Sequence, residues 1–154
     1  MKIEIYSRKA IMGLIDGDFP ENTAVISFYT PKNKREVGDG RVDYKGRCKA
    51  LYYVAIPDID IEILADYGYT YDSYLKEATE LSEFIYKAKN DGLDIICQCD
   101  YGQSRSAACA AAISEHFYKN GIEIFADYRY YPNQLCFHKI FDALKEEKRK
   151  NEEL

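Results

Sequence analysis

The sequence has no tryptophan and only two histidines. It has no apolar run near the ~20 residues needed to cross a bilayer. It also lacks a basic excess, because 21 Lys and Arg side chains stand against 26 Asp and Glu. The resulting net charge of −5 gives no electrostatic footprint for nucleic acid or for an anionic membrane. A hydrophobic content of 47% is too high for a disordered chain, and 154 residues are the size of one domain.

The cysteines form an odd set without the spacing of a disulfide framework. The first ten residues are interrupted by charges, unlike a secretory signal, so we expect a cytoplasmic location with reduced thiols. The five cysteines are Cys48, Cys97, Cys99, Cys109 and Cys136. The fifteen tyrosines are interpreted mostly as amphipathic rims of a core, while Tyr67, Tyr69 and Tyr71 are candidates for the wall of a binding pocket.

Strand-like and helix-like patterns alternate along the chain. Apolar runs rich in Ile, Val and Tyr predict strands over 2–6, 24–29, 50–56 and 93–99. Helical spacing predicts helices over 73–88, with Ser73 as N-cap, and over 104–119. A further helix is predicted from Pro132 into a charged tail that frays over 143–154. Shorter helices are predicted over 7–14 and 32–35. The glycine-rich stretch 38–47 is interpreted as a surface loop.

This alternation predicts a single α/β domain with a mainly parallel central sheet flanked by helices. In such sheets ligands bind at the carboxyl ends of the strands. The search for chemistry therefore begins where the apolar strands end.

The segment CDYGQSRS (residues 99–106) joins the last predicted strand to an alanine-rich helix. A helix N-terminus presents unpaired N–H groups and about half a positive charge, so this junction is suited to bind an anion. Cys99 at its edge is expected to be a thiolate, which is the competent nucleophile. Arg105 can place its planar fork on two phosphate oxygens, and Ser106 can donate its hydroxyl to the cysteine sulfur. Gly102 lets the backbone turn without a side chain in the way.

The spacing within this segment is specific. A bare Cys-x5-Arg pair is expected by chance about 0.2 times in a chain of this composition, and the added Gly and Ser lower that to about 6 in 10,000. CDYGQSRS resembles the Cys-x5-Arg-Ser/Thr loop of the cysteine-dependent protein tyrosine phosphatases, especially their compact dual-specificity type and its small bacterial relatives. The order of flanking elements over residues 24–144, ending with Pro132-Asn133, follows the same family.

The resemblance implies a protein tyrosine or dual-specificity phosphatase that hydrolyses phosphomonoesters through a phosphocysteine on Cys99. Its substrate would be a phosphotyrosine protein or peptide or a small phosphomonoester, and neither metal nor cofactor would be needed. An aspartate would protonate the leaving oxygen, and both Asp58 and Asp60 are candidates, with Asp58 slightly favoured by its Pro-Asp context. Asn133 would support the loop. The phosphate-binding residues implied are Asp100, Tyr101, Gly102, Gln103, Ser104 and Arg105.

Three residues depart from the family pattern. Gln98 replaces the histidine that usually precedes the cysteine and helps to organise the loop. Asp100 and Tyr101 replace small or neutral residues; because loop side chains usually point away while the amides point inward, we expect the Asp100 carboxylate to face outward. The loop carries no lysine, which makes polyphosphoinositides less expected as substrates.

Other functions fit part of the same pattern. A phospho-residue binding module without turnover would keep the anion site. A sulfurtransferase or an arsenate-type enzyme also uses a cysteine-led anion site, but low-molecular-weight phosphatases and arsenate reductases usually carry their loop near the N-terminus. A zinc site from Cys97, Cys99, His116 and His138 is disfavoured, because no second ligand pair has finger-like spacing.

Overall fold

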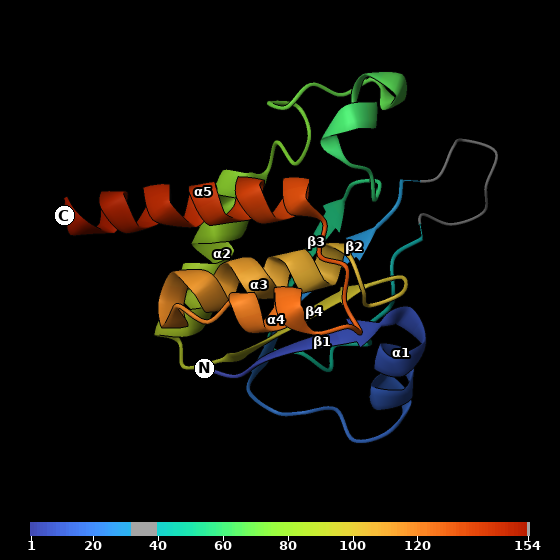
Figure 1. Ribbon diagram of the computed structural model, residues 1–154. Helices are drawn as coiled ribbons and strands as arrows, with labels where there is room; N and C mark the ends of the chain where they lie inside the picture. The colour runs from blue at the N-terminus through green and yellow to red at the C-terminus, as the bar shows by residue number, and fades with distance from the viewer. Residues whose placement is uncertain (32–39, 154) are drawn as a thin grey trace.

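Four parallel strands form a central sheet between layers of helices (Figure 1). The computed structural model describes residues 1–31 and 40–153. The strands are β1 (Ile3–Ser7), β2 (Thr23–Tyr29), β3 (Ala50–Ala55) and β4 (Asp94–Cys99), in the spatial order β1-β4-β2-β3. Every strand pair is parallel. The predicted parallel α/β sheet and its four strands are therefore confirmed.

Helices cover both faces of the sheet. They are α1 (Arg8–Asp16), α2 (Ala78–Asn90), α3 (Arg105–Tyr118), α4 (Ile122–Ala126) and α5 (Gln134–Glu152), with short 3-10 turns η1 (Ile61–Ile63) and η2 (Ala65–Tyr67). The packing of the core places α2, α3 and α5 on one face and α1 on the other (Figure 1). No helix in the described ranges 1–31 and 40–153 has the length and apolar character needed to cross a membrane.

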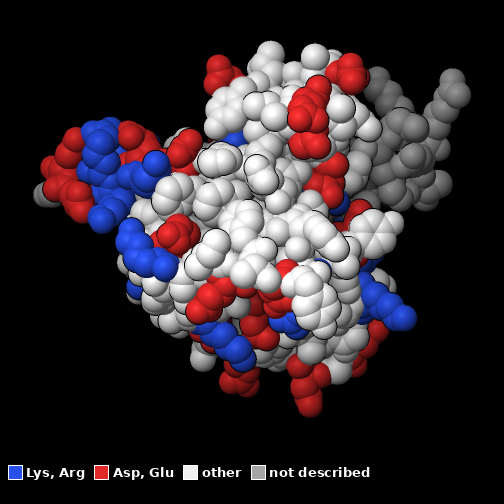
Figure 2. Space-filling model, viewed as in Figure 1, with Lys and Arg blue, Asp and Glu red and all other residues white. Residues whose placement is uncertain are grey.

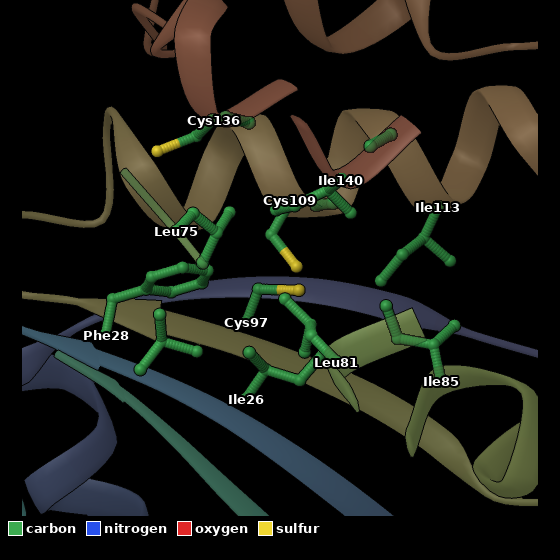
Figure 3. Packing of buried hydrophobic residues seen from close by; sticks show 14 of the residues in the cluster. Ile26, Phe28, Leu75, Leu81, Ile85, Cys97, Cys109, Ile113, Cys136 and Ile140 are labelled. Carbon is green, nitrogen blue, oxygen red and sulfur yellow. The ribbon is translucent and has the colours of Figure 1, made fainter. Parts of the chain in front are cut away.

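Alternation along the central strands divides the core in two. Ile95, Cys97 and Cys99 of β4 face the larger cluster, which they share with α2, α3 and α5. Figure 3 shows Cys97 within this cluster. Ile96 faces the smaller cluster beneath α1. Successive side chains of a strand point to opposite faces, so Gln98 must face the α1 side while Cys99 faces α3.

The predicted helix over 73–88 was wrong at its start, because α2 begins at Ala78. The Ser73 hydroxyl accepts a hydrogen bond from the Thr70 N–H over 2.8 Å, in a turn rather than as a helix cap. Leu75 has a φ of 52°, a left-handed conformation that a right-handed helix does not allow. Ser73 and Leu75 therefore belong to the irregular segment that leads into α2.

The other predicted helices agree more closely. The predicted helix over 7–14 is α1, which Ser7 caps by accepting from the Ala10 N–H over 3.1 Å. The last helix begins at Gln134 behind the N-cap Asn133, rather than at Pro132. The sequence did not predict α4, and the helix expected over 32–35 lies outside the described residues.

The predicted surface loop 38–47 is described from residue 40, and it is less superficial than expected. Val42 and Tyr44 are buried, and both pack in the smaller cluster with Ile11 and Ile15 of α1. This segment therefore helps α1 to cover one face of the sheet.

Candidate active site

The carboxyl ends of all four strands meet at one edge of the sheet, because every pair is parallel. β1 ends beside Arg8, β2 is followed by Thr30, β3 by Ile56, and β4 ends at Cys99. Residues that lie far apart in the sequence therefore surround the loop that follows Cys99.

This loop lies against the end of β1. The Arg8 backbone N–H donates a hydrogen bond of 3.0 Å to the Asp100 carbonyl oxygen. Gly102 has a φ of 67°, and a Cβ atom built there would lie 2.7 Å from the Ser7 backbone nitrogen. Only glycine allows both this conformation and this approach. Gly102 thus has the backbone role that the sequence predicted.

Cys99 lies at the base of the loop and is 2% exposed. Its Sγ is 3.0 Å from the Ser106 Oγ, in the first turn of α3. A hydroxyl at this distance can donate to a thiolate and stabilise it when it acts as a leaving group. The pair therefore has the geometry expected from the sequence.

Arg105 is 4% exposed, and its guanidinium is held from one side. Its Nη1 donates to the Ile56 carbonyl oxygen over 2.6 Å and to the Thr30 Oγ1 over 3.1 Å. Its Nε is buried and has no hydrogen-bond partner among the described residues, and its Nη2 lies 3.5 Å from the Asp100 Oδ2. Nε and Nη2 share one edge of the planar group, the fork that can grip two oxygens of an oxyanion. Arg105 is thus anchored through Nη1, and on its other edge the Asp100 contact with Nη2 leaves Nε without a partner among the described residues.

The structure brings Asp58 to the loop. Its Oδ1 accepts hydrogen bonds from the Ser104 hydroxyl over 2.7 Å and from the Asn133 amide over 2.9 Å. Asn133 also donates to the Ile59 carbonyl oxygen over 2.8 Å. Within residues 1–31 and 40–153, the Asp60 carboxylate makes no such bond, although both aspartates line the same cavity. Of the two candidate acids, Asp58 is the one tied to the loop.

A cavity of about 810 Å³ opens beside Asp58 and Ser104. Besides Asp58 and Asp60, its wall includes Glu62 and Asp142 as carboxylates. The sequence from Pro57 to Leu75 contains no Lys or Arg, and Figure 2 shows mainly acidic charged groups over η1 and η2. Tyr71 lines the cavity, as the sequence suggested, whereas Tyr67 and Tyr69 do not. The described wall of this cavity is therefore negatively charged.

Comparison with known proteins identifies the fold. No protein-family model and no curated protein sequence matches the chain. Solved structures do match along almost the whole length of the chain. PTPMT1 is 14% identical, with a TM-score of 0.55 over 99% of this chain and 96% of that one. The chain has the fold of the cysteine-dependent protein tyrosine phosphatases.

Two human proteins are similar to the same degree. DUSP28 is 12% identical, with a TM-score of 0.52 over 96% of this chain and 94% of that one. The tyrosine phosphatase-like serine/threonine/tyrosine-interacting protein is 15% identical, with a TM-score of 0.53 over 94% and 86%. The phosphatase fold that CDYGQSRS implied is thereby confirmed.

Gln98 has a structural role within this phosphatase fold. It is fully buried, and its Oε1 accepts hydrogen bonds from the Ser27 hydroxyl of β2 and from the Tyr44 hydroxyl, the latter over 2.7 Å. Among the described residues its Nε2 has no partner. Gln98 therefore links β4 to β2 and to the segment over α1, rather than to the loop that follows Cys99.

The expectation that the Asp100 carboxylate faces outward was wrong. It lies between two arginines, 3.5 Å from Arg105 Nη2 and 3.9 Å from Arg8 Nη1. The guanidinium groups of Arg8, which follows β1, and of Arg105, which begins α3, draw it inward. Tyr101 does point away and is 83% exposed, while the Gln103 carbonyl oxygen accepts from the Tyr131 N–H over 2.8 Å.

Sequence reasoning missed Arg8 and Thr30. Thr30 directly follows the predicted strand 24–29, and Arg8 lies two residues after the predicted strand 2–6. This position was the available signal, because the carboxyl ends of parallel strands meet. Arg8 and Thr30 reach the loop because the order of strands in the sheet places β1 and β2 on either side of β4.

The remaining cysteines are free thiols. Cys97 of β4 and Cys109 of α3 both lie in the core (Figure 3), and burial raises the pKa of Cys109. Burial raises the pKa of Cys136 to about 12, and the Tyr74 hydroxyl lies 3.3 Å from its sulfur. In the described part of the chain no group of three His, Cys, Asp or Glu side chains is arranged to hold a metal ion.

Proposed function

We propose that this chain is a cysteine-dependent phosphoric monoester hydrolase that acts as a protein tyrosine or dual-specificity phosphatase. The observation that carries the proposal is the Nε of Arg105, which is buried in the loop led by Cys99 and has no hydrogen-bond partner among the described residues. A buried guanidinium N–H without a partner is costly unless a ligand accepts its hydrogen bond. The phosphatase fold supports the same conclusion.

In the first step, the Cys99 thiolate attacks phosphorus in line. The S–P bond forms as the bond to the leaving oxygen breaks, and Asp58 gives its proton to that oxygen. Nε and Nη2 of Arg105 and the amides of the loop hold the equatorial oxygens as charge develops on them.

In the second step, Asp58 takes a proton from water, and the water oxygen attacks the phosphocysteine. The S–P bond breaks, inorganic phosphate is released, and the Ser106 hydroxyl, whose oxygen lies 3.0 Å from the Cys99 sulfur, donates to the departing thiolate. The assignment of the acid to Asp58 is supported by its bond to Ser104, in the loop itself.

The expected substrate is phosphotyrosine in a protein or peptide, or a small phosphomonoester. PTPMT1 has a solved structure in complex with PI(5)P. For this chain, the carboxylates of the adjoining cavity would repel a ligand with several phosphates, which supports a substrate with a single phosphate. We further propose a cytoplasmic location, in keeping with the free thiols.

One observation favours a second candidate, a phospho-residue binding module without turnover. Gln98 is turned away from the loop and bonded to Ser27 and Tyr44, so it cannot replace a loop-organising histidine. Such a module would bind phosphate and leave the ester intact.

The test is hydrolysis of para-nitrophenyl phosphate at about pH 5 to 8 without added metal, by the wild type and by Cys99→Ser. We expect turnover in the first and none in the second. Cys48→Ser, which changes a half-buried thiol beneath the other face of the sheet, is the matched control and keeps wild-type turnover. Equal rates in wild type and Cys99→Ser would overturn the mechanism. Phosphate binding without turnover would establish the binding module.

A further inference from the structure

We propose that Asp100 competes with the incoming phosphate for Arg105 and so sets the affinity of the site for anions. The inference rests on the anion site of the proposed function, but it does not require turnover. Its basis is a contact that departs from the sequence-based expectation: the carboxylate next to the nucleophile lies beside the arginine that the phosphate must use.

Each oxygen of the Asp100 carboxylate lies near a different arginine. Oδ2 is 3.5 Å from Arg105 Nη2, and Oδ1 is 3.9 Å from Arg8 Nη1. The backbone of the residue is pinned by the bond from the Arg8 N–H to its carbonyl oxygen. The Arg8 guanidinium is itself fixed by a bond of 2.6 Å to the Gly40 carbonyl oxygen. Asp100 therefore stays between the two cations.

The contact with Arg105 is incomplete. At 3.5 Å it is longer than a charge-assisted hydrogen bond, and it reaches Nη2 without reaching Nε. Nη1 is already occupied by Ile56 and Thr30, so a phosphate can form a forked pair only through Nε and Nη2. A phosphate that takes both donors must share Nη2 with Asp100 or displace the carboxylate from it.

In either case the Asp100 carboxylate keeps Arg8 as a partner and stays next to the bound phosphate. Like charges at such short range lower affinity, even when a cation lies nearby. Asp100 should therefore weaken the hold on phosphate, including the inorganic phosphate that the proposed reaction releases. A neutral residue of the same shape should remove this effect.

The experiment is titration of wild type, Asp100→Asn and Asp100→Ala with inorganic phosphate at pH 7, followed by calorimetry or by ³¹P NMR. We expect both variants to bind phosphate at least about threefold more tightly, the change typical of removing a partly exposed charge contact. Asp91→Asn is the matched control, because it removes one carboxylate beyond the opposite end of β4, where Asp91 pairs with Lys87. It should bind phosphate like the wild type.

Unchanged affinity in both Asp100 variants would overturn the inference and leave the proposed function intact. Weaker binding would also overturn it and would make Asp100 a residue that positions Arg105. If the wild type shows no hydrolysis but the Asp100 variants bind phosphate more tightly, the inference is upheld and the proposed hydrolase function is overturned. The Asp100 side chain is 38% exposed and belongs to neither core cluster, so we expect both variants to fold. Thermal unfolding of each variant checks this.

Discussion

The side-chain amide of Asn133 donates a hydrogen bond of 2.9 Å to the carboxylate of Asp58, joining the start of α5 to the loop after β3. The same nitrogen donates to the Ile59 carbonyl oxygen, and the Asn133 Oδ1 accepts from the Cys136 N–H as the helix N-cap. One largely buried side chain therefore both begins a helix and holds the proposed acid beside Ser104.

This double role predicts that two substitutions of Asn133 will differ. Asn133→Ala loses the cap and should lower the free energy of unfolding by about 1–2 kcal/mol, with a fall in kcat as Asp58 is released. Asn133→Ser keeps a capping oxygen but has no amide, so it should retain most of the stability and still lose kcat. Urea unfolding and para-nitrophenyl phosphate kinetics measure the two effects. Loss of stability without loss of kcat in either variant would contradict the link to Asp58.

The choice between the two candidate acids is open to a direct comparison. Asp58→Asn should lower kcat by about 10²-fold, because general acid catalysis contributes at least that much. Asp60→Asn should change kcat little, since the Asp60 carboxylate makes no bond to the loop within residues 1–31 and 40–153. The fall of kcat with rising pH that a general acid produces should disappear only in Asp58→Asn. The reverse pattern would assign the acid to Asp60.

Comparing substitutions at Gly102 and Gly92 tests the close approach of the loop to β1. Both have positive φ, 67° and 73°, but only at Gly102 would a Cβ meet backbone atoms, at 2.7 Å from Ser7 N and 2.9 Å from Tyr6 C. Gly92→Ala should cost about 1–2 kcal/mol from its conformation alone. Gly102→Ala should cost more than Gly92→Ala and also weaken phosphate binding. Equal unfolding free energies would show that the loop can move away from Ser7.

Gln98 should be more important for stability than for chemistry. Gln98→Met keeps the side-chain volume but leaves the buried hydroxyls of Ser27 and Tyr44 without their acceptor, at an expected cost of about 1–3 kcal/mol. Gln98→Ala should cost more, because it also creates a cavity. Guanidinium unfolding measures both changes. A Met variant as stable as the wild type would show that the two hydroxyls find other acceptors.

His116 predicts a dependence of stability on pH. Burial lowers its pKa below the ordinary 6.5, with Lys148 and Lys119 adding to the effect, and its Nε2 lies 2.6 Å from the Tyr86 hydroxyl. The unfolded chain then binds more protons between the lowered pKa and 6.5, so the free energy of unfolding falls as the pH is lowered through that window. His116→Gln should flatten this part of the profile. An unchanged slope in that variant would assign the effect to other groups.

The sequence by itself determined the parts of the site that lie within one stretch of chain. The four strands follow from short apolar runs, and the loop over 99–106 follows from a strand, a glycine and a helix start in close succession. Cys99, Gly102, Arg105 and Ser106 could be singled out because their spacing alone brings them to one loop. Local spacing did not reveal that α2 begins at Ala78, since the left-handed Leu75 is held by burial within the core.

Only the tertiary structure decided what surrounds that loop. Asn133, which is 75 residues away in the chain, binds Asp58, and the position of Arg105 depends on Ile56 and Thr30 at the ends of two other strands. The inward turn of Asp100 depends on Arg8 at the end of β1. These contacts arise because a parallel sheet gathers the carboxyl ends of distant strands, and no short stretch of sequence records which ends become neighbours.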